Sequence, residues 1–427
     1  MSLSRQAADQ RRFLAGPPPV ALYVHWPWCL RKCPYCDFNS HPRPDHWRQA
    51  SYIDALLADL DTELELQPLE QAVETLFIGG GTPSLIEPAE LHRLIAGIRG
   101  RLDLAAHAEL TLEANPGAAD AACFAQALDA GINRLSLGVQ SLSDAKLKAI
   151  GRVHDSAQAR QAFAQARQVG CRNINIDLMF GLPGQNLGQA RADLQAALAL
   201  EPEHLSYYQL TLEPGTAFER VPPSVPEDDL LADMAEQGQQ LLTDSGYRHY
   251  EVSAFARPGR MCRHNLNYWT FGDYLGLGAG AHGKRTDAKQ GRVVRRVKWA
   301  DPLRYLESVR LKQAAPDALV AETNELSDQD VILEFALNAL RLRQGVSLSL
   351  FEARAGLSRN RLAGARARAE EMGLLERGAS HLRASARGRL FLNSLLEYFM
   401  TDPPDEWLEV DRLGGGDRRD RASHRRL

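Results

Sequence analysis

The stretch Tyr23-Val24-His25-Trp26-Pro27-Trp28-Cys29-Leu30-Arg31-Lys32-Cys33-Pro34-Tyr35-Cys36 places three of the six cysteines of this 427-residue chain close together. Their spacing is Cys-x-x-x-Cys-x-x-Cys. A structural zinc site uses four ligands in two separated pairs, and the chain offers no second Cys or His pair at a familiar spacing. Three thiolates on one loop suit three irons of a 4Fe–4S cluster and leave the fourth iron open to a small ligand. We therefore predict that Cys29, Cys33 and Cys36 are ligands of such a cluster.

Short β-rich runs alternate with helical stretches around and after this loop. The runs are Val20–His25, Leu76–Ile78, Glu109–Glu113, Arg134–Leu137, Ile174–Leu178 and His204–Leu210. The helical stretches between them are Tyr52–Leu66, Ala89–Ile98, Ala121–Ala130, Ala157–Val169 and Leu187–Leu200. Such alternation implies right-handed crossovers and a parallel sheet. We predict an α/β fold, a partial (β/α)6 barrel of the TIM type that does not close into an eight-fold ring.

A second, helical region begins near Leu326. Helical periodicity covers Asp328–Leu342, Leu348–Ala355 and Arg359–Met372, followed by a short hairpin at Leu374–Leu382 and a closing helix at Ala386–Phe399. This order is typical of a winged-helix-like module, for which we expect a structural or substrate-covering role rather than DNA binding. We place the domain limits at 1–19 (extended lead-in), 20–320 (barrel with a glycine-rich extension), 321–400 (helical domain) and 401–427 (disordered tail).

The overall composition excludes several classes of protein. Counts of 50 Lys+Arg and 54 Asp+Glu give a formal net charge of −4, without the basic excess that nucleic-acid binding needs. The cysteines are too few for a disulfide-stapled secreted scaffold. The N-terminal residues lack the apolar segment of a secretory signal, and no run of about 18 apolar residues could span a membrane. We expect a cytoplasmic protein with no membrane span and no nucleic-acid partner.

The cysteine spacing resembles that of radical S-adenosylmethionine enzymes. In that family the open iron chelates the amino and carboxylate groups of S-adenosylmethionine. The reduced cluster passes one electron to the sulfonium, which releases methionine and a 5′-deoxyadenosyl radical. The resemblance places the ring of Tyr35 against adenine, and it implies an electron donor such as flavodoxin or ferredoxin.

Polar and glycine residues at the ends of successive strands match the same family in position. Gly79-Gly80-Gly81-Thr82-Pro83 follows the second strand, where the absence of Cβ atoms lets backbone groups approach a charged ligand. The later βα units supply an acid, an amide and an arginine, and such units open onto the C-terminal face of a barrel. The resemblance assigns contacts with S-adenosylmethionine to Tyr23, Tyr35, Gly80, Gly81, Thr82, Glu113, Gln140, Arg152 and Asp177.

The stretch from Tyr23 to about Met400 resembles the group related to oxygen-independent coproporphyrinogen III oxidase. The oxidase itself carries a further cysteine two residues after the third, where this chain has Phe38. It also has a longer N-terminal segment that contacts its substrate. Both differences argue against propionate decarboxylation, which remains the alternative function.

A second motif, Cys262-Arg263-His264-Asn265-Leu266-Asn267-Tyr268-Trp269, resembles the His-Asn-x-x-Tyr-Trp motif of HemW-like heme chaperones. Histidine is a common axial ligand of heme iron, and Tyr and Trp offer apolar faces to a porphyrin. Spacing alone favours a structural histidine beside two core aromatics. In that case the protein could be a radical enzyme that acts on another substrate.

The resemblance favours heme binding at His264, with His282 and Cys262 as alternative iron ligands. It implies a heme chaperone without oxidase activity, with heme and an acceptor hemoprotein as partners. The sequence leaves a homodimer open.

Overall fold

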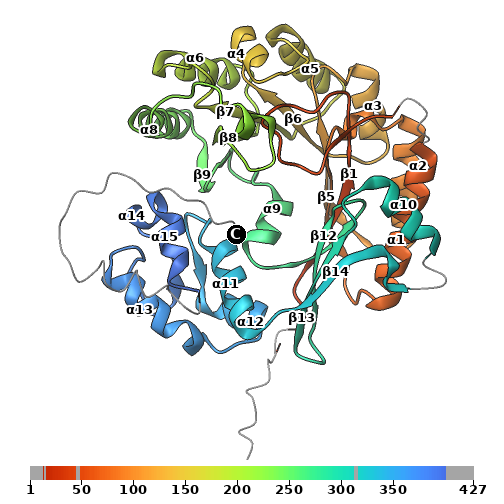
Figure 1. The fold of residues 1–427 in the computed structure, drawn as a ribbon, viewed down its shortest axis with the longest axis vertical. Coiled ribbons are helices and arrows are strands. Elements are labelled where there is room, and N and C mark those ends of the chain that lie inside the picture. Colours follow the sequence, from red (N-terminus) through yellow and green to blue (C-terminus); the bar gives the residue numbers. More distant parts are fainter. Residues whose placement is uncertain (1–12, 14–15, 45–48, 312–315, 401–427) are drawn as a thin grey trace, which may run out of the picture.

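The computed structural model describes residues 13, 16–44, 49–311 and 316–400. Its large sheet has the strand order β14-β13-β12-β11-β1-β4-β5-β6-β7-β8-β10-β9. The sheet is curved, helices cover its convex side, and the C-terminal helices lie on its concave side (Figure 1). Most of the predicted lead-in and all of the predicted tail at 401–427 lie outside the described residues.

The six parallel strands predicted from the sequence form the centre of this sheet. They are β1 (Val20–Trp26), β4 (Val73–Gly80), β5 (Leu104–Ala114), β6 (Arg134–Gln140), β7 (Ile174–Phe180) and β8 (His204–Gln209). Each strand pairs in parallel with the next. The connections contain α1 (Gln49–Leu66), η1 (Pro83–Leu85), α2 (Pro88–Arg99), α3 (Ala121–Asp129), α4 (Asp144–Ala149), α5 (Ser156–Gln168) and α6 (Leu187–Leu198). The prediction of a partial (β/α)6 arrangement is confirmed.

Local sequence explains why these elements form. All residues of β1 except Tyr23 are buried, as expected of a parallel strand covered on both faces. Helices α5 and α6 each begin at a capping box, made by Asp155 with Gln158 and by Asn186 with Gln189. Each box satisfies two backbone N–H groups that the first helical turn leaves without partners.

Further strands extend the sheet at both ends. Next to β1 lies β11 (Asp273–Leu277) in parallel, followed by antiparallel β12 (His282–Asp287), β13 (Arg292–Lys298) and β14 (Val320–Glu325). The other end carries β10 (Ala254–Ala256) and β9 (Arg248–Glu251). The remaining elements of this part are β2 (Trp28–Cys29), β3 (His41–Pro42), α7 (Ala217–Arg220), α8 (Asp228–Asp244), α9 (Arg263–Trp269), α10 (Pro302–Leu311) and η2 (Pro316–Leu319).

The C-terminal region is helical with a small two-stranded sheet. It contains α11 (Asp328–Ala339), β15 (Val346–Ser347), α12 (Leu348–Ala355), η3 (Arg359–Leu362), α13 (Ala363–Glu371), β16 (His381–Leu382), α14 (Ala386–Leu390) and α15 (Leu392–Glu397). The predicted hairpin is held by the bridge Leu375↔Ala384, and its return strand β16 also pairs with β15. The predicted closing helix is two helices, because Phe391 leaves the helical conformation at φ −116° and ψ 50°.

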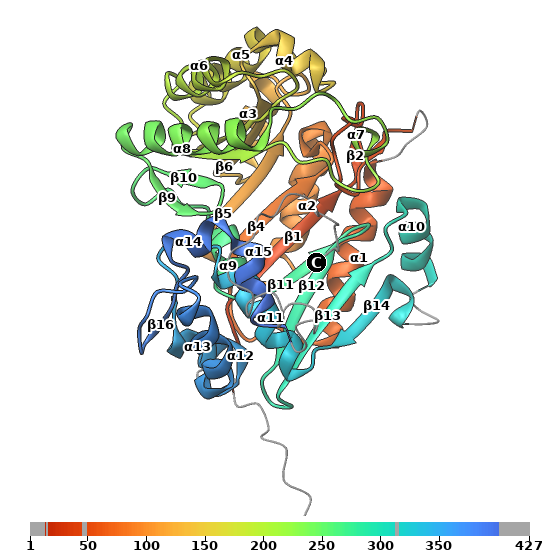
Figure 2. The ribbon, with the colours of Figure 1, turned by 60° about the vertical axis from the view of Figure 1, so that its left-hand side comes forward.

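Figure 2 shows the C-terminal helices beside α9 and strands β11 and β12. Helix α9 contacts β1, β4 and α11, so it lies between the barrel and the C-terminal region. None of the helices in the described ranges has the length and apolar character to cross a membrane.

Candidate functional site

The cysteine loop follows β1 and lies beside the turn after β4 and beside Gly151 and Arg152. Cys29 is buried, whereas Cys33 and Cys36 are half-buried. The backbone N–H of Cys36 donates to the carbonyl of Cys33 at 3.1 Å, which closes the loop between these two thiols. Among the described residues, no set of His, Cys, Asp and Glu side chains is already arranged as a metal site. The structure therefore places the three thiols on one loop.

Arg152 brings a positive charge to this loop. Its Nη1 lies 3.6 Å from the sulfur of Cys33, and its Nη2 donates to the carbonyl of Gly138 at 2.5 Å. Burial raises the pKa of the Cys29 and Cys36 thiols, so both are protonated at neutral pH in the protein alone. A metal would displace those protons, and the Arg152 guanidinium would offset part of the resulting negative charge.

The glycine turn packs tightly against the cysteine loop. A Cβ atom on Gly80 would lie 2.6 Å from the His25 ring, and one on Gly81 would lie 2.6 Å from the carbonyl oxygen of Trp28. The N–H of Gly81 donates to the carbonyl of Trp26, and that of Thr82 donates to the carbonyl of Trp28. The N–H of Gly80 donates to the Glu113 carboxylate at 3.0 Å. These N–H groups are thus engaged within the protein, and they can meet a carboxylate ligand only if these bonds break.

The other predicted contacts lie on neighbouring strands at the same end of the sheet. Gln140 ends β6 with φ 70°, and its Oε1 accepts a hydrogen bond from the Tyr208 hydroxyl at 2.8 Å. Asp177, in β7, accepts from Asn175 at 2.7 Å. Burial, followed by the nearby charge of Asp177, raises the pKa of Glu113 to about 8. The sheet therefore brings two acids of raised pKa and one amide to a common face.

Two aromatic residues of the predicted set, Tyr23 and Tyr35, have different neighbours. The hydroxyl of Tyr23 is 3.0 Å from Nδ1 of His25, whose Nε2 is 2.8 Å from the carbonyl oxygen of Asn39. The ring of Tyr35 lies 6.5 Å from that of Phe218, between the cysteine loop and α7. Burial raises the pKa of both tyrosines, which stay protonated.

Several polar partners in this region were not predicted from the sequence. His25, Asn175 and Tyr208 each hydrogen-bond a predicted residue. Strand residues two positions apart share a face. The sequence could therefore have indicated His25, two positions after Tyr23, and Asn175, two positions before Asp177.

His264 lies in the protein interior. Its side chain is 1% exposed, its Nδ1 is 2.9 Å from the Thr75 hydroxyl, and its Nε2 is 2.9 Å from the Tyr268 hydroxyl. Burial, with the charge of Arg134, lowers its pKa to about 3. Both ring nitrogens of this neutral imidazole are therefore already in use. The Cys262 thiol is equally buried, and it lies 3.6 Å from the Glu109 carboxylate.

A cavity of about 750 Å³ lies next to these groups. One wall comes from β1 and the cysteine loop, with Tyr23 and Phe38, and a second comes from α9, with Tyr268 and Trp269. Strands β12 and β13 and helix α11 supply the remaining walls. The cavity thus connects the predicted cofactor face to the predicted heme motif and to the C-terminal region.

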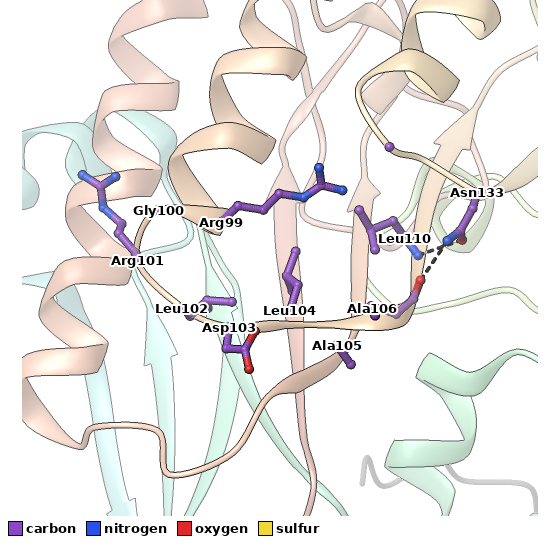
Figure 3. A pocket seen from close by; sticks show the side chains of 12 residues that line it. Arg99, Gly100, Arg101, Leu102, Asp103, Leu104, Ala105, Ala106, Leu110 and Asn133 are labelled. Atoms are coloured by element: carbon purple, nitrogen blue, oxygen red, sulfur yellow. Dashed lines mark hydrogen bonds between the residues drawn. The ribbon is translucent and has the colours of Figure 1, made fainter.

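A second hollow of about 780 Å³ lies at the opposite, amino-terminal end of β5 (Figure 3). Its lining includes Arg99, Arg101 and Asn133, and it contains no aromatic side chain. Asn133 is engaged with the backbone of Ala108 and Leu110. Because it lacks aromatic groups and lies away from the strand ends that carry the cysteine loop, this hollow is not part of the candidate site.

Comparison with known proteins agrees with the fold and the motifs. The Radical SAM superfamily profile matches residues 23–197, and the HemN C-terminal domain profile matches residues 326–391. The heme chaperone HemW of Escherichia coli K12 is 46% identical over 390 residues, which cover 90% of this chain and 99% of that protein. The chain belongs to the HemW family of radical S-adenosylmethionine proteins.

Other similar proteins extend this HemW relationship. The heme chaperone HemW of Haemophilus influenzae is 42% identical over 90% of this chain and 99% of its own length. The mitochondrial radical S-adenosyl methionine domain-containing protein 1 of Bos taurus is 35% identical over 95% of this chain and 94% of its own.

Among solved structures, the coproporphyrinogen III oxidase HemN of Escherichia coli superposes with a TM-score of 0.76. The match covers 90% of this chain and 91% of HemN at 24% identity. At that identity, the likeness establishes the shared fold.

Proposed function

We propose that this protein is a heme chaperone that binds a 4Fe–4S cluster and S-adenosylmethionine and hands heme to an acceptor hemoprotein. The observation that carries the proposal is the cavity of about 750 Å³ between the cofactor face and α9. Its volume is in the usual range of small-molecule sites, and Tyr268 and Trp269 offer flat apolar faces for a porphyrin. The naming of similar proteins as heme chaperones supports the same function. We place its action in the cytoplasm.

The donor set fits the proposed cluster. Cys29, Cys33 and Cys36 would each hold one iron, and Phe38 offers no further thiol to compete for the open position. When bound, the cluster and S-adenosylmethionine supply one-electron chemistry that side chains cannot perform. Arg152 lies against Cys33, where it can pair with the carboxylate of the methionyl group.

The remaining predicted contacts surround the rest of that cofactor. Because the N–H groups of Gly80, Gly81 and Thr82 are engaged, we propose that this turn meets the methionyl ammonium with carbonyl oxygens. Glu113 and Asp177 would accept hydrogen bonds from hydroxyl or ammonium groups, and Gln140 would supply an amide. Tyr35 would stack on the adenine, and Tyr23 would close the side toward the heme cavity. His264 would hold the Tyr268 hydroxyl and so orient that ring at the cavity wall.

An anaerobic heme titration of the reconstituted protein tests this function. We expect a saturable Soret difference band with one heme per chain. We also expect no protoporphyrinogen from coproporphyrinogen III incubated with S-adenosylmethionine and a reductant. Cys33→Ala is expected to lose the broad visible absorption of the cluster. Turnover of coproporphyrinogen III would identify an oxidase, and a heme titration without saturation would overturn the chaperone function.

A further inference from the structure

The hairpin of β12 and β13 presents a row of polar side chains to the cavity. In its register, Lys284 lies opposite Arg295, and His282 lies two residues before Lys284. Residues two apart on a strand, and residues directly opposite on paired strands, share one face of the sheet. His282, Lys284 and Arg295 therefore lie on the same face, and all three line the cavity.

His282 differs from His264 in its accessibility. His282 is exposed, and within the described ranges neither of its ring nitrogens has a hydrogen-bond partner, whereas both nitrogens of His264 are bonded. An accessible imidazole without a protein partner can bind a metal that enters the cavity, because histidine is a common metal ligand. Ligation by His264 would require breaking its contact with either Thr75 or Tyr268.

Arg295 is the cation on this face that is free to change partners. Its guanidinium lies 3.5 Å from the Glu334 carboxylate of α11, at the cavity wall, and it donates to the Tyr274 hydroxyl. By contrast, Lys284 is only 2% exposed and is bonded at 2.8 Å to Asp273, which is equally buried. A carboxylate entering the cavity can therefore replace Glu334 beside Arg295, while the Lys284 pair stays intact.

The spacing of these side chains suits a porphyrin. A heme ring is perpendicular to the bond between its iron and the histidine nitrogen, so a ring held by His282 would lie along the hairpin face. Two residues of a strand span about 7 Å, and adjacent strands lie about 5 Å apart. Arg295 is therefore displaced from His282 along the plane of the ring, in the direction in which a propionate extends. Tyr268, Trp269 and α11 would cover the opposite side.

We propose, building on the heme-chaperone function above, that His282 is the axial ligand of the bound heme iron and that Arg295 pairs with a heme propionate in exchange for Glu334. The axial step forms one bond from the histidine nitrogen to ferric iron and displaces a weakly held water, with no change of oxidation state. The propionate step exchanges one carboxylate partner of Arg295 for another.

The experiment compares His282→Ala, His264→Ala and Arg295→Gln with wild type in the cluster-containing protein. Ferric heme is titrated and followed by its Soret difference spectrum and its electron paramagnetic resonance. We expect His282→Ala to change the Soret position and the spin state, to weaken binding at least tenfold, and to recover the wild-type spectrum when imidazole is added. We expect His264→Ala to keep the wild-type ligand-field spectrum. His92→Ala, a surface substitution on α2, controls for the loss of a histidine elsewhere.

Arg295 is tested with the dimethyl ester of heme, which has no propionate charge. Wild type should bind heme several-fold more tightly than the ester, and Arg295→Gln should lose this preference while keeping the wild-type spectrum. Iron content and circular dichroism confirm that each variant is folded. A wild-type spectrum in His282→Ala, or its loss in His264→Ala alone, would overturn the assignment of the ligand. A preference for heme that survives in Arg295→Gln would overturn the propionate contact. Absence of heme binding by wild type would instead reject the proposed function.

Discussion

Glu113 is an acid whose surroundings disfavour its charge. Its carboxylate accepts one backbone hydrogen bond, from Gly80, and Asp177 lies close enough to repel it. Its pKa of about 8 means that the carboxyl group is mostly protonated at neutral pH until a cation or a hydroxyl donor arrives. Such a raised pKa is common where a ligand later supplies the missing interactions.

This raised pKa predicts a pH-dependent effect of Glu113→Gln on stability. An acid that ionises near pH 4.5 when unfolded and near pH 8 when folded loses its contribution to stability as the pH rises through that window. Glutamine does not titrate, so the melting temperature of the variant relative to wild type should rise between pH 5 and pH 8. We expect a gain of about 2 °C or more in protein free of S-adenosylmethionine, measured by thermal unfolding. Glu236→Gln, at an exposed position of α8, should show no such trend, and a difference that is constant with pH would contradict the assignment.

For single residues, the sequence predicts the proposed cluster and cofactor ligands better than it predicts the side chains that hydrogen-bond to them. Cys29, Glu113 and Asp177 stand out because their residue types recur at strand ends and in one loop. Their partners Asn175 and Tyr208 are polar residues of strands, and period-two alternation would place such residues toward solvent. Only the curvature of the sheet, which turns a face of each strand toward the interior, shows that these side chains support the site.

Contacts between elements hold the cysteine loop in place. The turn after β4 lies against the backbone of residues 26–28, and its N–H groups donate to the carbonyls of Trp26 and Trp28. Backbone atoms, unlike side-chain tips, cannot rotate away from an added group. The glycine at position 81 is therefore required by packing, whatever it contributes to a cofactor.

Gly81→Ala should consequently disturb the cysteine loop. The new Cβ would lie 2.6 Å from the Trp28 carbonyl oxygen and 2.9 Å from that of Trp26, so the loop must move. We expect reconstituted iron content to fall at least twofold and the melting temperature to decrease. Gly364→Ala serves as the control, because it lies in α13 with no atom within 4 Å of the added Cβ. That change should leave iron content unchanged. Full iron loading in Gly81→Ala would show that the loop can form the cluster from another position.

The sequence predicts a strand or helix where its hydrophobic periodicity and length are clear. It does not predict strands whose apolar pattern is interrupted by glycine or charged residues. The six central strands are β-rich and regular. Strand β11 lies in a glycine-rich stretch, and β13 has three charged residues within four positions, Arg295, Arg296 and Lys298, so neither resembles a buried strand. Their pairing depends on the neighbouring strand β1 and on the C-terminal region, which local sequence does not encode.

The molecule has two main apolar cores, and the cavity lies where they meet. The larger core joins the barrel strands to the outer helices, and the second is built around Phe335 and Phe351 of the C-terminal region. The second core also includes Phe271, which lies between α9 and β11, and Val293 of β13. The C-terminal region is thereby packed against the hairpin that carries His282 and Arg295, with α11 forming one wall of the cavity.

This arrangement predicts that Phe335→Ala separates heme binding from cluster binding. The side chain is fully buried and lies 5.6 Å from the ring of Phe271 and 5.0 Å from that of Phe351, so its removal should cost about 3–5 kcal/mol in the second core. Loosening α11 opens the cavity wall that holds Glu334, and heme affinity should fall at least tenfold. Iron content should stay at the wild-type level, because the cysteine loop contacts the larger core through Trp28 and a small separate cluster around Phe218 through Tyr35, and neither cluster includes Phe335.

The matched control is Phe124→Ala in α3, an equally buried phenylalanine of the larger core. This substitution removes the same side-chain volume on the outer side of the barrel, away from the cavity. Heme affinity should therefore be retained at temperatures at which the variant is folded. Thermal unfolding, iron analysis and heme titration of the three proteins measure these effects together. Equal losses of iron and heme in Phe335→Ala would mean that the two cores fold as one unit. A loss of heme in Phe124→Ala matching that in Phe335→Ala would mean that the affinity follows overall stability rather than the wall formed by α11.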